Sequence, residues 1–143
     1  MVNVINTLEQ SPFWSTTAVI IDYDDSDGWY DHQMAAIANG SFTTDDSVSG
    51  PNACGVSGTT AQLPGPNSGG APVQGRCMYG PRTPLLVISP WAKPNFVDHT
   101  LTNQASVLLF IEQNWNLGLI GGGSADAISN PINNMFNLSL IHI

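Results

Sequence analysis

The segment IIDYDDSDGWYDHQ, residues 20–33, contains five aspartates within ten positions and neither lysine nor arginine; they are Asp22, Asp24, Asp25, Asp27 and Asp31. The whole chain has only 11 acidic residues, so almost half of its negative charge is concentrated here. Two carboxylates 6 Å apart repel each other by roughly 3 kcal/mol at the effective dielectric of a protein surface. Such crowding indicates either solvated carboxylates that cap turns and helix starts, or ligands of a hard divalent cation.

Asp24 and Asp25 form the best candidate ligand pair. The chain is expected to leave a strand at this point, where neighbouring carboxylates can converge on one ion. Carboxylate oxygens suit Ca²⁺, Mg²⁺ or Mn²⁺, and they suit zinc when an imidazole joins them. An EF-hand is excluded, because a loop with Gly28 at its sixth position would begin at Tyr23 and end at Met34, and neither side chain binds calcium.

Two further side chains near the cluster could contact an anionic group of a ligand, for example a phosphate. His32 can contact the phosphate or orient Asp31, although the more common role for such a residue is a partly buried hydrogen bond to a turn carbonyl. Arg82 can reach the phosphate as a bidentate donor, or it can pair with an aspartate of the cluster and stabilise the loop. Both residues are candidates for contact with the substrate or for supporting the ligands.

Other residues with chemical potential have weaker signals. Trp29 and Tyr30 can line a substrate cleft, although aromatic residues beside a buried strand more often belong to the core. We expect His99, beside Asp98, to act at the start of a helix rather than in catalysis, and His142 to be inert.

The elements that must position these residues are two strands and two helices. TTAVIIDY at 16–23 and TPLLVIS at 83–89 are nearly continuous apolar runs, typical of strands buried on both faces, and we expect the first to be central and parallel. Helices are predicted at 3–11 and 103–115. In the second helix, Asn103 can cap the start and Gly118 follows the end. The apolar residues form one stripe, which consists of Val107, Leu108, Ile111 and Trp115.

This order of elements predicts an α/β layered sheet. Ligands of such sheets bind at the carboxyl ends of the strands, and the aspartates stand there. Because a parallel sheet needs neighbouring strands and covering helices, we expect this chain to form the edge or end of a larger α/β domain.

Composition restricts the possible partners. The 143 residues fit one domain, and 42% of them are hydrophobic. A net charge of −8 argues against nucleic acid or an anionic membrane surface as the main partner, so a phosphate-bearing substrate would need a metal bridge. No run is long enough to span a membrane, and the start MVNVINTLEQ lacks the pattern of a signal peptide.

Residues 39–80 have no sustained periodicity and are predicted to be a long loop inserted in the domain. Cys54 and Cys77 lie in this loop, too far apart for a CxxC motif. We expect them to form a disulfide, which would argue for an oxidising compartment, and two unpaired thiols in a cytosolic protein are the alternative.

Two blocks of the sequence resemble a known family. WSTTAVIIDYDDSDGWYDH, followed by GPRTPLLVISPWAKPNFVDHTLTNQASVLLFIEQNW, resembles the C-terminal part of the bacterial phosphoesterase family that contains phosphatidylcholine-type phospholipases C and an acid phosphatase branch. The resemblance covers residues 3 to about 117. It implies an alkaline-phosphatase-like three-layer fold, hydrolysis of phosphoric esters by a metal-bound hydroxyl nucleophile, and a metal-ligand role for Asp24 and Asp25.

The sequence also departs from the family pattern. Members carry a Glu-Asn metal-ligand motif near the N-terminus, then a Ser or Thr nucleophile and phosphate-binding histidines, and no counterpart is found here. We therefore interpret residues 1–143 as a single C-terminal segment, inactive alone, that needs an N-terminal half as partner. The resemblance and the expected disulfide imply a periplasmic or secreted protein. The alternative function is a non-catalytic module that binds a divalent cation.

Overall fold

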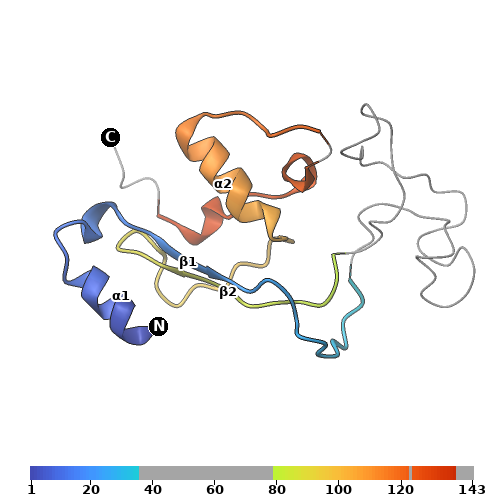
Figure 1. Ribbon diagram of the computed structural model, residues 1–143, viewed down its shortest axis with the longest axis horizontal. Coiled ribbons are helices and arrows are strands. Elements are labelled where there is room, and N and C mark those ends of the chain that lie inside the picture. Colours follow the sequence, from blue (N-terminus) through green and yellow to red (C-terminus); the bar gives the residue numbers. More distant parts are fainter. Residues whose placement is uncertain (36–78, 123, 138–143) are drawn as a thin grey trace, which may run out of the picture.

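The computed structural model describes residues 1–35, 79–122 and 124–137. Its elements follow in the order helix α1 (Val2–Glu9), strands β1 (Val19–Asp22) and β2 (Leu85–Ile88), and helix α2 (Ala105–Trp115) (Figure 1). Short 3-10 turns occur at η1 (Trp14–Thr16), η3 (Ala125–Ile128) and η4 (Asn133–Met135). Both predicted helices and both predicted strands are therefore confirmed, with shorter bounds, and the mixture of helices and strands agrees with the α/β class.

The two strands pair in the antiparallel direction, so the expectation of a parallel strand was wrong. The register places Asp22 opposite Leu85 and Val19 opposite Ile88. A continuous apolar run indicates that a strand is buried, but it does not determine the direction of its neighbour, and this is why the sequence misled. The antiparallel register brings the residues just before β2 beside the loop that leaves β1.

The strands are also less buried than predicted. Leu86 of β2 is 52% exposed, and every residue of β1 is half-buried or exposed. Figure 1 shows α2 and the C-terminal turns on one side of the sheet. Burial on both faces was therefore wrong for the described part of the chain, because no described element covers the other face.

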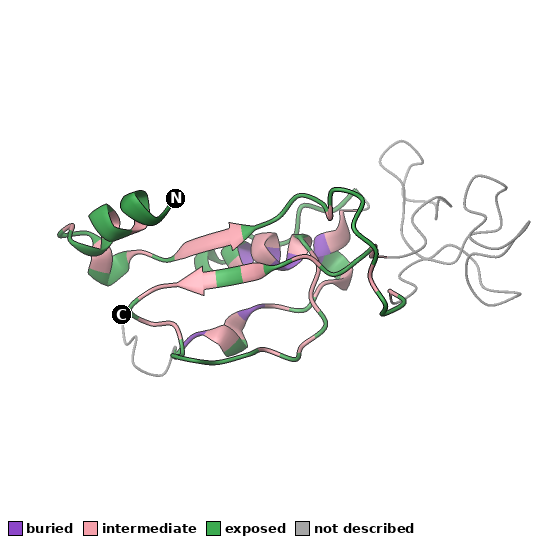
Figure 2. Ribbon diagram, turned by 90° about the horizontal axis from the view of Figure 1, so that it is seen from below, coloured by how far each residue is buried: buried purple, intermediate pink, exposed green. Residues whose placement is uncertain are grey.

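The buried residues of the described part all lie in α2 and the turns that follow it (Figure 2). Ile132 and Phe136 are two of its buried apolar side chains. The ring of Phe136 stacks on that of Phe110, with ring centroids 4.8 Å apart. The turns after α2 also contain the most buried apolar side chain of the described residues, Ile132, which is 0% exposed.

Helix α2 buries a different stripe from the one predicted. Its buried residues are Ser106, Leu109 and Glu112, whereas Ile111 and Trp115 are exposed. The cap was also mistaken, because Asn103 Oδ1 accepts a hydrogen bond from the Ser129 hydroxyl at 2.7 Å and α2 has no side-chain cap. Hydrophobicity alone chose the wrong stripe, since the buried side includes a serine and a glutamate.

The helix ends at Asn116, which adopts the left-handed conformation at φ 52° two residues before the expected glycine. Asparagine tolerates this conformation better than most residues do, so it can end a helix in place of glycine.

No helix in the described ranges is long and apolar enough to cross a membrane.

Candidate functional site

Asp24 and Asp25 follow β1 with only Tyr23 between, and both side chains are exposed. The prediction that a strand leads into the aspartate cluster is therefore confirmed. Asp22, the last residue of β1, is exposed as well. A ligand from solvent can reach all three carboxylates without displacing the core.

The aspartate loop, residues 23–35, turns sharply at Asp27 and Gly28, whose φ angles of 51° and 81° are left-handed. Glycine adopts this conformation without steric cost, and aspartate tolerates it. Asp25 Oδ1 accepts a hydrogen bond from the Asp27 N–H, which closes the turn. One oxygen of Asp25 therefore shapes the loop, and the described residues leave its other oxygen available to a ligand.

Gln104, immediately before α2, fixes the end of β1 from a distant part of the chain. Its side-chain amide donates hydrogen bonds to the carbonyl oxygens of Tyr23, at 2.9 Å, and of Asp24. The backbone that carries the two candidate ligands is thus tied to the start of the helix. The sequence offered no signal for this contact, because the residues are 80 positions apart.

Arg82 and Asp31 form a bidentate ion pair across the mouth of the loop. Arg82 Nε donates to Asp31 Oδ2 at 2.8 Å, and an Nη2 hydrogen is donated to Oδ1 at 2.7 Å. The backbone N–H groups of Arg82 and Gln33 also donate to this carboxylate. Pairing with an aspartate of the cluster, one of the two roles considered for Arg82, is therefore what the structure shows.

This contact perturbs both ionisable groups. The hydrogen bond from Arg82 and those from the backbone of Gln33 and Arg82 hold the pKa of Asp31 well below its usual range. The same pairing raises the pKa of Arg82. Since the pKa of Asp31 is depressed, its contribution to stability is present above the ordinary aspartate pKa and is lost as the pH falls through the lowered one.

Replacing Arg82 with lysine should lower the midpoint of thermal unfolding at pH 7, although the charge is kept. Lysine cannot reproduce the two parallel bonds that the guanidinium forms. The effect should be modest, because the Arg82 side chain is 73% exposed and solvent weakens the pair. Circular dichroism melts of Arg82→Lys, Asp31→Asn and the control Asp27→Asn test this. An unchanged melt for Asp31→Asn would contradict it.

A groove of about 570 Å³ lies beside the aspartate loop. Its lining consists of Tyr23, Asp25, Ser26, Asp27, Trp29, Tyr30, Asp31, His32, Pro81, Arg82, Thr83 and Pro84. Trp29 and Tyr30 are 77% and 82% exposed, so they line the groove and do not belong to the core. The groove thus joins carboxylates, one guanidinium and aromatic surface, which are the groups that bind a polar ligand with an apolar part.

The histidines differ in position. His32 is exposed in the groove, and its ring packs edge-on against Tyr30 with centroids 5.1 Å apart, so it is not the partly buried residue that was expected. His99 is exposed, and its neighbour Asp98 accepts hydrogen bonds from the N–H and hydroxyl of Thr100 in the turn that precedes α2. His142 lies outside the described residues.

The aspartate loop provides part of a ligand set for a metal ion. Asp24 and Asp25 offer exposed oxygens of the type that hard cations prefer. Within the described ranges, however, no three histidine, cysteine, aspartate or glutamate side chains lie close enough together to hold an ion. The donors thus fit a divalent cation in kind but not in number. The two cysteines and the Asp45–Asp46 pair lie outside the described residues.

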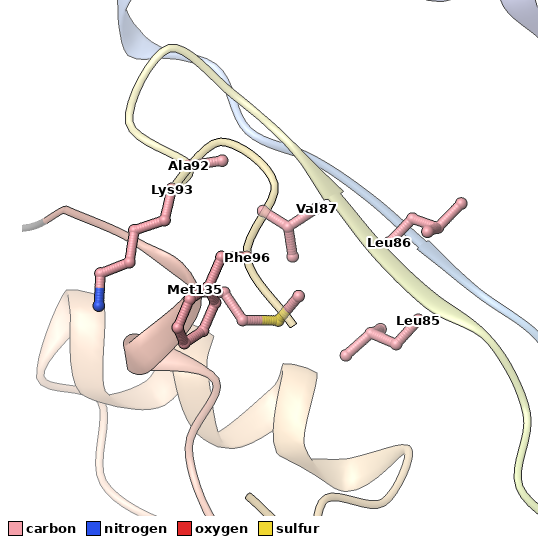
Figure 3. A pocket seen from close by; sticks show the side chains of 7 residues that line it. All are labelled: Leu85, Leu86, Val87, Ala92, Lys93, Phe96 and Met135. Atoms are coloured by element: carbon pink, nitrogen blue, oxygen red, sulfur yellow. The ribbon is translucent and has the colours of Figure 1, made fainter. Parts of the chain in front are cut away.

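A second, smaller pocket of about 120 Å³ lies between β2 and the C-terminal turns (Figure 3). Apart from Lys93, its lining is apolar, and it consists of Leu85, Leu86, Val87, Ala92, Lys93, Phe96 and Met135. Lys93 Nζ lies 4.8 Å from the centre of the Phe96 ring. None of these side chains is acidic, so this pocket is a gap in apolar packing rather than a catalytic centre.

Known proteins are similar in sequence to most of this chain. Residues 1–118 match the phosphoesterase family. The chain is similar to a non-hemolytic phospholipase C of Burkholderia pseudomallei, at 33% identity over 79% of this chain and 15% of that protein. It is similar to the non-hemolytic and hemolytic phospholipases C of Pseudomonas aeruginosa, at 31% and 32% identity over 80% of this chain and 16% and 14% of those proteins.

The chain thus spans about 15% of the length of these relatives. The matched segment includes β1, the aspartate loop, β2 and α2, and it contains every residue that lines the groove. From the match over most of its length, the chain belongs to the phosphoesterase family.

Proposed function

We propose that this chain carries part of the active site of a metal-dependent phosphoric ester hydrolase of the phospholipase C or acid phosphatase type. The observation that carries the proposal is the exposed pair Asp24 and Asp25 at the end of β1, beside a groove of about 570 Å³, in a chain of the phosphoesterase family. The three phospholipase C relatives favour a phosphate ester or phospholipid as substrate.

Asp24 and Asp25 are the proposed metal ligands. A bound divalent cation would depress the pKa of a hydroxyl nucleophile and neutralise charge on the phosphoryl oxygens. Oxygen ligands suit Ca²⁺, Mg²⁺ or Mn²⁺, and Zn²⁺ would require an imidazole in addition. The chain's own residues support this by position, since Gln104 fixes the ligand backbone and the turn at Asp27 orients one carboxylate.

Arg82 is the proposed contact for the phosphate. Its guanidinium has five N–H donors, and the pair with Asp31 uses Nε and one Nη2 hydrogen. The Arg82 side chain is 73% exposed and lines the groove. Its remaining N–H donors can therefore bind an anion while the ion pair with Asp31 fixes the position of the guanidinium. His32, exposed in the same groove, is a second candidate for this contact.

The surrounding domain would supply the remaining parts of the active site. We expect a nucleophile, further ligands and further strands of an alkaline-phosphatase-like three-layer fold from a longer polypeptide or a second chain. The exposure of the sheet and the much greater length of the relatives support this. Placement in the periplasm or outside the cell rests on the expected bridge between Cys54 and Cys77.

Binding of a divalent cation should depend on Asp24 and Asp25 and not on Asp45 and Asp46, an acidic pair that follows no predicted strand. A strand end holds its ligands in place, whereas charge alone attracts ions diffusely. Isothermal titration of Asp24→Asn and Asp25→Asn with Ca²⁺, Mn²⁺ and Zn²⁺ should show weaker binding than the wild type. The matched control Asp45→Asn should keep wild-type affinity, and equal losses in all three variants would contradict the assignment.

A further inference from the structure

The inference concerns two buried carboxyl groups at the opposite end of α2 from Gln104. Glu112, on α2, is 4% exposed, and Asp126, on η3, is 1% exposed. The two elements pack against each other, and each of the two carboxyl groups shifts the pKa of the other. Burial of two acidic side chains side by side is costly unless a positive charge or a proton offsets the repulsion.

The described part of the chain provides no positive charge for this pair. Its one arginine and one lysine lie elsewhere, Arg82 on Asp31 and Lys93 over the ring of Phe96. Its two histidines, His32 and His99, are exposed. From residue 100 to residue 137, which covers α2, η3, η4 and the turns between them, Glu112 and Asp126 are the only ionisable side chains. No other titratable group from the packed elements therefore faces them.

The hydrogen bonds of the pair are incomplete in a way that a proton would correct. Asp126 Oδ2 accepts a hydrogen bond from the Ile120 N–H at 3.0 Å. Asp126 Oδ1 and both Glu112 oxygens are buried, and none of the three forms a well-aligned hydrogen bond with the described residues. A proton on one of the two carboxyl groups would give these oxygens a donor.

We propose that Glu112 and Asp126 share one proton, that this proton holds α2 against η3, and that its loss at rising pH loosens the helix. Asp126 is the partner that keeps the negative charge, because it already accepts the Ile120 N–H. Glu112, whose buried oxygens accept no well-aligned hydrogen bond from the described residues, carries the proton. The Glu112–Asp126 pair, called the latch below, thus holds α2 in an acid-dependent way and is separate from the proposed chemistry of the groove.

The directions of the pKa shifts agree with this assignment. Burial, and then the neighbouring Asp126, raise the pKa of Glu112. Hydrogen bonds, first of all that from Ser124, lower the pKa of Asp126. Because the pKa of Glu112 is raised in the folded chain, its contribution to stability is complete below the ordinary glutamate pKa and is lost as the pH rises through the raised one. The pKa of Asp126 is lowered instead, so at a pH between the two pKa values the pair of carboxyl groups holds one proton.

The latch is connected to the aspartate loop through the helix itself. Gln104, at the start of α2, donates hydrogen bonds to the carbonyls of Tyr23 and Asp24. Loosening of α2 at its far end would weaken this tie and release the end of β1. The position of the loop should therefore be better defined in mild acid than at alkaline pH.

The chain has only two glutamates, Glu9 and Glu112, which makes a direct test possible. Selective ¹³C labelling of the glutamate side-chain carboxyl in the 143-residue chain gives two signals, and Glu9→Gln assigns them. Glu9 is exposed at the end of α1 and provides the reference titration. The Glu112 signal should titrate at a higher pH than the Glu9 signal, and equal midpoints in the wild type would overturn the proposal.

Two variants test the sharing and its consequence. In Asp126→Asn the amide can donate to Glu112, so the Glu112 titration should move down toward that of Glu9. Thermal melts between mild acid and mild alkali should show a loss of stability with rising pH in the wild type and in Glu9→Gln, but not in Glu112→Gln, whose amide is neutral throughout. An unchanged Glu112 titration midpoint in Asp126→Asn would show that burial alone raises the pKa of Glu112, and it would overturn the proposal that the two carboxyl groups share a proton.

Discussion

The 143-residue chain by itself should hydrolyse neither p-nitrophenyl phosphate nor p-nitrophenylphosphorylcholine at a measurable rate. A cation held by two carboxylates keeps most of its waters, so its power to activate a nucleophile is slight. Positioning of a hydroxyl against phosphorus is worth several kcal/mol of the barrier, on the order of 7 kcal/mol in well-oriented systems. The described residues provide no such arrangement, because no side chain among them forms a hydrogen bond with the Ser26 hydroxyl.

The assay uses purified protein loaded with Ca²⁺, Mn²⁺ or Zn²⁺ and compares both substrates with buffer. Ser26→Ala is the matched variant, since Ser26 carries the aliphatic hydroxyl nearest in sequence to the proposed ligands and lines the groove. Turnover that disappears in Asp24→Asn would contradict the expected inactivity. A simultaneous loss in Ser26→Ala would then identify the nucleophile within this chain.

The second large effect is expected in a chimera. Residues 3–117 would replace the matching segment of the non-hemolytic phospholipase C of Pseudomonas aeruginosa, to which they are similar over 80% of this chain. Asp24→Asn or Asp25→Asn in an active chimera should lower kcat about 100-fold or more. Loss of a residue that merely supports a metal ligand already costs roughly 10- to 100-fold, and loss of a ligand should cost at least as much.

The design needs a control that separates ligation from folding. Asp27→Asn is suitable, because Asp27 neighbours the same turn and asparagine tolerates the left-handed conformation at φ 51°. This control should keep most of the activity and the unfolding midpoint. Equal losses in Asp24→Asn, Asp25→Asn and Asp27→Asn would contradict a metal-ligand role for the pair and favour a general effect of charge on the loop.

The sequence alone located the elements and the candidate ligands. One apolar run that leads into aspartates was enough to predict a strand followed by the aspartate cluster, and the structure has β1 followed by Asp24 and Asp25. The family was also accessible, because two long blocks in the right order resemble its C-terminal part. These features depend on local patterns of residues, which a single sequence contains in full.

The contacts that build the groove were decided by tertiary structure. The antiparallel register places Arg82 beside Asp31, 51 residues away, and Gln104 reaches the carbonyls of Tyr23 and Asp24 from the start of α2. An apolar run does not specify the direction or register of its partner strand. The sequence could therefore leave open whether Arg82 binds phosphate or an aspartate, but it could not choose between them.

The buried side of α2 was determined in the same way. Hydrophobicity favoured a stripe through Ile111 and Trp115, but the folded chain buries Glu112 against Asp126 and leaves those two apolar residues exposed. A glutamate 14 positions before an aspartate carries no local signal of contact, and its burial is tolerable only when a proton or a cation offsets the charge. Sequence determined which groups are present, and packing decided which of them lose their solvent and therefore change their chemistry.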